Sequence, residues 1–143
     1  MAVQFSGKEY YKSVYGCNEA YWLLYRLLEE REKTENISHK KMPSYLDHVL
    51  YVNNKPHREW WLIYSADTCV GQLYLTSKNE IGIQIFEEFR RRGYAKKAIS
   101  FVMANYHKID LIANINPNNV ASIALFTKFG FKVCQHTYKR DGT

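Results

Sequence analysis

Apolar residues recur at helical spacing near the start of the chain. Asn18 is well placed to cap a helix there, and the periodicity continues to about Arg31. The apolar positions that define this face are Tyr21, Leu24, Tyr25 and Leu28. The pattern therefore predicts one amphipathic helix over residues 18–31.

A second helix is predicted after a polar stretch. Residues 34–42 show no periodicity, and Ser44 with Asp47 three positions later resembles a capping box. The helix that this box opens runs to about Val52. The first third of the chain is thus predicted to be helix, loop, helix.

Three apolar and aromatic segments follow at short spacing. They cover residues 58–65, 70–76 and 80–86 and are rich in Trp, Ile, Val, Leu and Tyr. Only short polar turns separate them, and connections this short join antiparallel neighbours. The pattern predicts an antiparallel meander of three strands.

The last third of the chain alternates helix and strand. Helices are predicted over 93–106 and 118–129, and strands over 109–115 and 131–138. Gly130 lies where a left-handed residue is expected to end the second helix. The complete order predicts an α/β (α+β) fold, with a mixed, mostly antiparallel sheet flanked by helices.

The composition fits a single folded domain of residues 1–143. The chain is 46% hydrophobic and 15% aromatic with 7 Gly and 3 Pro, which excludes both a disordered and a fibrous chain. The longest apolar run, residues 20–25, is far shorter than the roughly 20 residues that cross a bilayer, and the polar start holds no signal core. We therefore expect a cytoplasmic protein with no membrane partner.

The cysteines and histidines give no pattern of a disulfide framework or a metal site. The three cysteines, Cys17, Cys69 and Cys134, are odd in number and form no C-x-x-C pair. His39 and His48 lack the carboxylates and cysteines that would complete a metal site. No metal is expected.

Positive charge is concentrated at one predicted helix start. The net charge is +6 with a pI near 9.2, which favours anionic partners. Five cations crowd the beginning of the 93–106 helix: Arg90, Arg91, Arg92, Lys96 and Lys97. They oppose the positive end of the helix dipole, and a bound phosphate removes that conflict, with Gly93 and Ala95 leaving room for its oxygens. A solvated surface face is the alternative. The nucleotide P-loop and dinucleotide patterns are both absent.

Two motifs in this half of the chain resemble those of one enzyme superfamily. Arg90, Gly93 and Ala95 match the Q/R-x-x-G-x-G/A motif of the GNAT acetyltransferases. The run from Asn116 to Phe131 resembles the closing motif of the same family, an Asn-led helix that ends in L-[YF]-x-K-x-G-F. The resemblance covers about residues 58–138.

This resemblance implies acetyl-CoA as co-substrate, bound by the 58–138 core. In the family fold the fourth and fifth strands, here 80–86 and 109–115, splay apart, and the pantetheine arm pairs with the exposed strand edge. The residues that the resemblance places along acetyl-CoA are Gln84, Ile85, Phe86, Arg90, Arg91, Arg92, Gly93, Tyr94, Ala95, Lys96, Asn119, Ser122 and Phe126. Core packing is an equal alternative for Phe126, and helix capping is the alternative for Asn119.

Acetyl transfer to an amine needs a base, because an ammonium must lose its proton before it attacks the thioester. The resemblance places this base at Glu80, for which an exposed strand-end charge is the alternative. Two positions that hold a catalytic glutamate or tyrosine in other branches carry Asn114 and Phe126 here. The proton donor for the thiolate stays open: another hydroxyl such as Tyr138 or Tyr74 replaces the tyrosine, or the thiolate leaves without an acid.

The acceptor is expected on the mainly helical segment 1–57, because this segment walls the cleft opposite the cofactor in the family fold. The residues expected to bind it are Arg26, His39, Tyr45 and His48. Cations and aromatic rings suit a nucleotide-linked amino sugar or another small amine. A protein N-terminus or lysine is the alternative, with Glu29, Glu30, Glu32 and Glu35 as clustered acidic residues.

Direct N-acetyl transfer without a covalent acyl-enzyme is the leading function, because no cysteine lies inside a matched motif. A nucleic-acid-binding module is an alternative from another class, but the cations gather at one helix start and not along a face, so no nucleic acid partner is expected. A sensor that binds acyl-CoA without turnover is the other alternative. The expected assembly is a monomer or homodimer.

Overall fold

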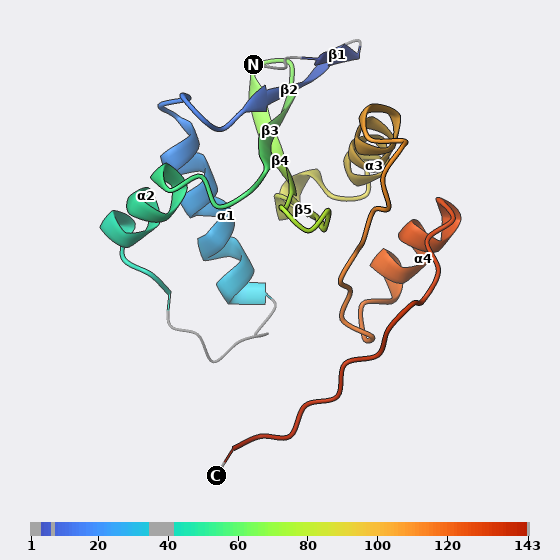
Figure 1. Ribbon diagram of the computed structural model, residues 1–143. Coiled ribbons are helices and arrows are strands. Elements are labelled where there is room, and N and C mark those ends of the chain that lie inside the picture. The colour runs from blue at the N-terminus through green and yellow to red at the C-terminus, as the bar shows by residue number, and fades with distance from the viewer. Residues whose placement is uncertain (1–3, 7, 35–41, 143) are drawn as a thin grey trace.

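A computed structural model of the chain describes residues 4–6, 8–34 and 42–142 (Figure 1). Its strands form one five-stranded sheet in chain order, and each neighbouring pair is antiparallel. The strands are β1 (Gln4–Ser6), β2 (Glu9–Ser13), β3 (Glu59–Ser65), β4 (Thr68–Leu75) and β5 (Ile81–Ile85). The antiparallel meander predicted for β3, β4 and β5 is confirmed.

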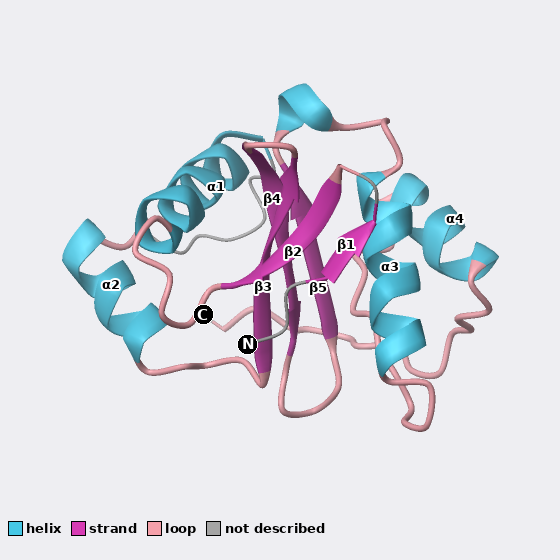
Figure 2. Cartoon of the chain, turned by 90° about the horizontal axis from the view of Figure 1, so that it is seen from above, coloured by secondary structure: helices cyan, strands magenta, loops and turns pink. Residues whose placement is uncertain are grey.

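Helices cover both faces of the sheet (Figure 2). α1 (Ala20–Thr34) and α2 (Tyr45–Asn53) lie on one side, and α3 (Tyr94–Asn105) and α4 (Val120–Lys128) lie on the other. A short 3-10 helix, η1 (Glu87–Phe89), follows β5. The predicted α/β architecture of a sheet flanked by helices is confirmed.

Local backbone chemistry sets two of the helix boundaries as predicted. Ser44 caps α2, because its Oγ accepts the Asp47 amide at 3.1 Å. Gly130 has a φ of +90° one residue beyond the C-cap of α4, where only glycine is free of a Cβ penalty. Both residues are read correctly from sequence because capping depends on a few neighbouring positions.

The start of α1 differs from the prediction. The helix begins at Ala20, and the Leu23 amide donates to the Glu19 carbonyl at 3.1 Å. Glu19 therefore holds the cap position, since the carbonyl of the cap residue accepts the first intrahelical bond, and the predicted cap at Asn18 is wrong. The Glu19 carboxylate also binds Lys12 of β2 at 2.8 Å, which ties the helix start to the sheet.

Two strands precede α1 where the sequence analysis expected none. β2 pairs with β3, with Tyr11 opposite Ile63, and the Tyr11 ring stacks on Phe101 of α3 with 4.2 Å between centroids. The strand signal is weak because Glu9 and Lys12 flank the two tyrosines of a five-residue segment. Long-range pairing with β3, and not local pattern, makes this segment a strand.

The strand predicted at 109–115 is not formed. Ile112 alone makes a sheet contact, a parallel bridge to Glu80 in which the Ile81 amide donates to the Ile112 carbonyl at 2.8 Å. No further bridge follows in the described structure, so the segment leaves the edge of β5 after one contact. This divergence matches the splay that the family resemblance implies for the two segments.

The strand predicted at 131–138 is also not formed. The segment is irregular, and the side chains of Val133 and Tyr138 are 78% and 91% exposed. A chain in extended conformation becomes a strand only beside a hydrogen-bonding neighbour, and no described strand pairs with this one. Figure 1 shows it running away from the rest of the molecule.

Hydrophobic clusters occupy both faces of the sheet. The cluster on the α3 side includes Leu73 and Ile99, and the cluster on the α1 side includes Leu27 and Leu62, all fully buried. Burial of such side chains is the main stabilising term, at about 1.5–3 kcal/mol for each one. Across the described ranges, no helix has the length and apolar character needed to cross a membrane.

Acid should weaken the fold through two histidines. Burial lowers the pKa of His48 and of His57 below the ordinary value of 6.5. The unfolded chain then binds more protons than the folded chain, so the free energy of unfolding should fall as pH drops below 6.5 and through the folded pKa. Urea unfolding at pH 7.5, 6.5 and 5.5 measures this. The variant His57→Phe keeps a ring in place, so its free energy of unfolding should fall less between pH 7.5 and pH 5.5 than that of the native protein. An equal fall in the two proteins would contradict a contribution of His57 to the pH dependence.

Candidate functional site

The backbone of β5 alternates between its two edges. The Phe86 amide donates to the Val70 carbonyl at 2.9 Å, so Gly71 and Ile85 face each other as a pair without mutual hydrogen bonds. The amide and carbonyl of Ile85 therefore point away from β4. By the same alternation, the amides and carbonyls of Ile83 and Ile81 also point away from β4.

This alternation leaves an open edge on β5. At its beginning the Ile81 amide bonds to Ile112, as described above. Further along, the amide and carbonyl of Ile83 and the amide of Ile85 have no partner among the described residues, while the Ile85 carbonyl accepts Arg90 Nε at 3.1 Å. An edge of this kind can bind an extended amide-containing chain by adding one more strand.

The open edge leads directly to the start of α3. Gly93 is the N-cap of this helix with a φ of +86° and makes no capping hydrogen bond through a side chain. The first backbone bond of the helix runs from Lys97 to the Gly93 carbonyl, which leaves the amides of Tyr94, Ala95 and Lys96 without a described partner. Arg91 also has a positive φ of 65°, and such alternation of backbone conformation forms a concave nest of N–H groups. This geometry binds anions, phosphates above all.

The cations around this helix start divide into two groups. Lys97 is paired with Glu9 at 2.7 Å, and Arg90 lies 4.0 Å from Glu30 while its Nε holds the Ile85 carbonyl. The second group forms no ion pair with any described carboxylate, and its members are Arg91, Arg92 and Lys96. Arg92 stacks over the Phe89 ring with 5.6 Å to the centroid. Three of the five cations are thus free to meet an anionic ligand.

The side chains at the end of β5 are buried or engaged in hydrogen bonds. Ile85 is in the core on the α3 side, and Phe86 is in the core on the α1 side. Gln84 turns toward α1, where its Nε2 donates to the Leu27 carbonyl at 2.6 Å. A ligand on this edge can therefore meet the backbone of Ile85, but not its side chain.

Gln84 belongs to a hydrogen-bonded chain that crosses three strands. Trp60 Nε1 donates to Gln72 Oε1 at 2.9 Å, and Gln72 Nε2 donates to Gln84 Oε1 at 3.0 Å. With the bond to Leu27, the chain ties β3, β4 and β5 to α1. This network is not predictable from sequence, because its only signal is a glutamine at matching positions of two neighbouring apolar strands.

Glu80 lies at the point where β5 and the 109–115 segment separate. Its Oε1 accepts the Thr76 hydroxyl at 3.1 Å, and its Oε2 accepts Asn114 Nδ2 at 2.6 Å. The structure thus joins the two positions at which the family resemblance looks for a base. Both oxygens hold a donor, which fixes the carboxylate beside the open edge.

On α4 the structure gives two residues a local role. Asn119 is the N-cap, and its Oδ1 accepts the Ser122 amide at 3.1 Å. Phe126 is 8% exposed and packs edge-on against Phe131, so its ring belongs to the core. The structure therefore shows for both residues the structural role that the sequence analysis kept as an alternative.

The residues expected to bind the acceptor do not share one contact. Arg26 stacks over the Phe86 ring at 5.4 Å, whereas Tyr45 and His48 pack on Tyr25 further along the face of α1 and α2. His48 is buried, with its Nε2 3.0 Å from the Tyr21 carbonyl. His39 lies outside the described residues.

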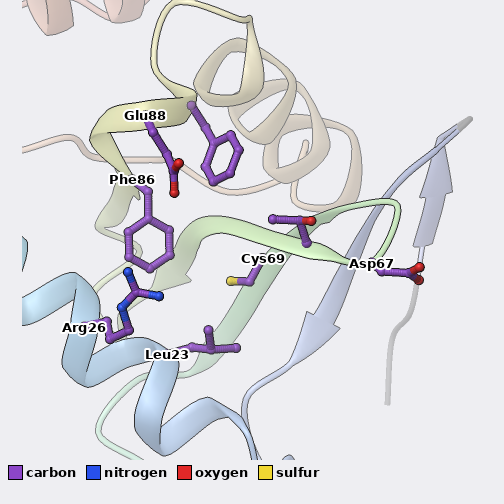
Figure 3. Close-up of a pocket in the computed structure, with 8 residues that line it drawn as sticks. Leu23, Arg26, Asp67, Cys69, Phe86 and Glu88 are labelled. Atoms are coloured by element: carbon purple, nitrogen blue, oxygen red, sulfur yellow. The ribbon is translucent and has the colours of Figure 1, made fainter.

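Arg26 and Phe86 line a pocket of about 230 Å³ between α1, the start of β4 and η1 (Figure 3). In the close-up the guanidinium lies beside the ring, while the Asp67 carboxylate points away. The complete lining is Leu23, Arg26, Asp67, Thr68, Cys69, Phe86, Glu88 and Phe89. Burial raises the pKa of the Cys69 thiol to about 12, so this thiol stays protonated and is a poor nucleophile.

An aromatic cluster lies on the same face of the sheet. The ring of Tyr74 stacks on His57 with 4.0 Å between centroids and 7° between planes, and His57 meets the edge of Trp60 at 4.6 Å. Tyr74 faces Gly82 of β5, and a Cβ at Gly82 would overlap its ring. The sequence analysis gave Gly82 no role, because the reason for a glycine here is a ring from another strand. Within the described part of the chain, no group of three His, Cys, Asp or Glu residues could hold a metal ion.

Loss of the Gln84 amide should destabilise the fold. Gln84→Leu keeps the approximate volume but leaves Gln72 Nε2 and the Leu27 carbonyl without their partner. Each unsatisfied buried polar group costs about 1–3 kcal/mol, and the lower end applies to each of these two part-buried groups, so the free energy of unfolding should fall by about 2 kcal/mol in total. Urea unfolding at constant pH measures the change. Gln135→Leu makes the same replacement at an exposed site and should cost below about 0.5 kcal/mol. Equal losses of unfolding free energy in Gln84→Leu and Gln135→Leu would contradict a structural role for the network.

Three comparisons place this geometry among known proteins. Sequence comparison with curated proteins gives no match. Among solved structures, RimL ribosomal alpha-N-protein acetyltransferase in complex with coenzyme A is 15% identical, with a TM-score of 0.71 over 89% of this chain and 82% of that chain. Spermidine N-acetyltransferase from Vibrio cholerae, described as dodecameric, is 16% identical with a TM-score of 0.71 over 92% and 83% of the two chains. The microcin self-immunity acetyltransferase MccE in complex with acetyl-CoA and AMP is 16% identical, with a TM-score of 0.65 over 88% and 79%. The Acetyltransferase (GNAT) domain family matches residues 17–132, so the chain belongs to the GNAT acetyltransferases.

Proposed function

We propose that this protein transfers an acetyl group from acetyl-CoA to a primary amine by direct attack. The observation that carries the proposal is the continuity of two binding surfaces, the open edge of β5 and the uncapped start of α3. One surface binds extended amides and the other binds phosphate. Acetyl-CoA contains both groups in sequence, and among the structures similar in fold are complexes with CoA and acetyl-CoA.

The residues present fit the two parts of acetyl-CoA. Pantetheine has two amides, and the free backbone groups of Ile83 and Ile85 are spaced as one side of a strand ladder. The pyrophosphate goes to the amides of Tyr94, Ala95 and Lys96, where Arg91 and Arg92 supply charge. On the other wall, the proposal keeps Asn119 and Ser122 at the start of α4.

Glu80 is the proposed base, acting directly or through water. Its carboxylate is fixed by Thr76 and Asn114 at the point where the open edge begins. The proton that it takes comes from the attacking amine. Transfer in this scheme uses no acyl-cysteine intermediate, because Cys69 is buried and protonated, and the exposed Cys134 lies on the irregular segment after α4.

The proposed acceptor is a small molecule bound on the α1 side of the sheet, with a nucleotide-linked amino sugar tested first. The pocket at Arg26 supports this choice, since its guanidinium can bind a phosphate and also lies over the ring of Trp22, which is 55% exposed and can stack on a base. The structures similar in fold include a spermidine N-acetyltransferase, a ribosomal alpha-N-protein acetyltransferase and an acetyltransferase in complex with AMP. A polyamine, a protein N-terminus and a nucleotide-linked amine therefore all belong in the panel.

Charge reversal at the α3 start should remove acetyl-CoA binding. Isothermal titration of the intact protein should give a micromolar Kd, and Arg92→Glu should weaken binding by at least about tenfold, which corresponds to roughly 1.4 kcal/mol. The reason is that the variant puts a carboxylate where the pyrophosphate is held.

Lys108→Glu supplies the matched control, because it makes the same charge change just past the opposite end of α3. Its affinity for acetyl-CoA should stay within about threefold of the native value, since it lies outside the phosphate site. Equal losses in both variants would mean that net charge, and not a site, attracts the ligand. No binding by the native protein would overturn the proposed function and direct the loop to a nucleic-acid test.

Removal of the base should slow turnover on whichever amine the panel identifies. Glu80→Gln keeps the shape and can still accept from Thr76, but it cannot take a proton, so kcat should fall by about 10²- to 10⁴-fold while the affinity for acetyl-CoA is retained. Steady-state kinetics on that amine and titration with acetyl-CoA, each with both proteins, measure this. An unchanged kcat would exclude Glu80 as base, and binding without turnover on any amine would favour the sensor.

A further inference from the structure

The structure separates the two hydroxyls that the sequence analysis left open as proton donors. Tyr138 is 91% exposed on the segment that runs away from the molecule, and Phe126, with no hydroxyl, is in the core. Tyr74 lies on the sheet two residues before Thr76, which contacts Glu80. We propose that the Tyr74 hydroxyl donates the proton to the departing CoA sulfur, an inference that rests on the function proposed above.

Gly82 makes this position possible. Tyr74 of β4 stands directly opposite Gly82 of β5, and a Cβ on Gly82 would fall on the Tyr74 ring. The atom nearest to that Cβ is Cζ, and the two Cε atoms are equally far from it, so the ring lies flat over Gly82 with its hydroxyl end above β5. Any other residue at 82 would push the ring away.

The direction of the ring points the hydroxyl across β5 toward the open edge. The ring starts on β4 and already reaches the Gly82 position with Cζ. The oxygen is one bond further along the same axis, and therefore extends toward the open side of β5. That side carries the free backbone groups of Ile83. Because the pyrophosphate is proposed to bind at the start of α3, beyond Ile85, the thioester end of the pantetheine arm lies back along β5, beside Ile83.

Neighbouring groups hold the ring in this place. His57 stacks on the face of Tyr74 that is turned away from Gly82, so the ring is sandwiched between the imidazole and the strand. The backbone of His57 is fixed in turn, since its carbonyl accepts the Tyr15 hydroxyl at 2.7 Å and its amide donates to the same oxygen at 3.1 Å. A ring held on both faces can present its hydroxyl without loss of rotamer freedom during the reaction.

Two groups near the beginning of β5, the Glu80 carboxylate and the Tyr74 hydroxyl, balance the protons of the step. The neutral amine attacks the thioester carbonyl, and a C–N bond forms as the carbonyl electron pair moves to oxygen. When the tetrahedral intermediate collapses, the C–S bond breaks and its electron pair goes to sulfur, which takes the proton of the Tyr74 hydroxyl. Glu80 takes the proton that the nitrogen loses, and solvent returns a proton to the Tyr74 oxygen. The products are the amide and CoA with a free thiol.

The test uses CoA itself and needs no acceptor. If the hydroxyl meets the sulfur, the native protein should bind CoA about three- to tenfold more tightly than desulfo-CoA at pH 8, the value of one hydrogen bond. Tyr74→Phe keeps the ring but removes the hydroxyl. The variant should bind CoA as weakly as desulfo-CoA, because only its affinity for CoA falls. Thiolate absorbance of bound CoA in the ultraviolet should appear at lower pH on the native protein than on the variant.

Two further variants separate the hydroxyl from the fold. Gly82→Ala displaces the ring and should reproduce the loss of sulfur discrimination while desulfo-CoA still binds. Tyr64→Phe removes a hydroxyl from the adjacent strand β3, where the ring stacks on Tyr10 and not over β5, and should keep the discrimination. Circular dichroism of each variant confirms that the sheet is intact.

The outcomes distinguish this inference from the function on which it rests. Failure of the native protein to bind CoA or desulfo-CoA would overturn the proposed function. Tight binding of both with no difference between native protein and Tyr74→Phe would overturn only the role of Tyr74. Once an amine is known, Tyr74→Phe should lower kcat by about 10²-fold or more with little change in the KM for acetyl-CoA.

Discussion

The structure depends on the one-sided pairing of β5. On one edge this strand completes the antiparallel ladder with β4, and on the other it makes a single bridge, between Glu80 and Ile112, before the next segment diverges. Unpaired backbone N–H and C=O groups at a strand edge cost free energy when they are buried, and an exposed edge can pair with another chain. Such an edge is therefore expected where a ligand forms hydrogen bonds with it. The fold therefore positions the site by leaving a ladder incomplete.

The alternation of a strand explains why one short segment can serve several purposes. Ile81, Ile83 and Ile85 send side chains into the α3-side core while their backbone groups face the open edge. Gln84 sends its side chain to α1, and Gly82 has none, which leaves room for Tyr74. Core packing, anchoring of α1 and the proposed ligand binding thus use different directions of the same five residues, and a shift of register by one residue would disrupt all three.

Features that depend on nearby residues were predictable from the sequence. Ser44 and Gly130 are identified from sequence because capping is local. The cations around Gly93 predict an anion site from helix-end electrostatics alone; the structure shows a helix start without a side-chain cap there, and the anion site itself stays a prediction. Features that depend on a partner strand were not. β2 is not predicted because its pairing with β3, and not its own sequence, makes it a strand. Strands are wrongly predicted at 109–115 and 131–138 because both segments have an apolar strand pattern but no neighbouring strand to form a ladder with. The reason for a glycine at position 82 becomes visible only when the structure places the Tyr74 ring over it.

The electrostatics of the α3 start links stability to binding. Arg91, Arg92 and Lys96 add positive charge to the positive end of a helix that no side chain caps, an arrangement that opposes folding of the free protein. A diphosphate bound at the proposed site would remove the repulsion and accept hydrogen bonds from the amides, so its binding energy would include relief of a cost that the free protein bears. Ligands that bind only the folded chain stabilise it in proportion to their affinity. In the proposed scheme, the helix start that carries this electrostatic cost is therefore also the segment that a bound ligand would stabilise, and the same positive charge would select for anions.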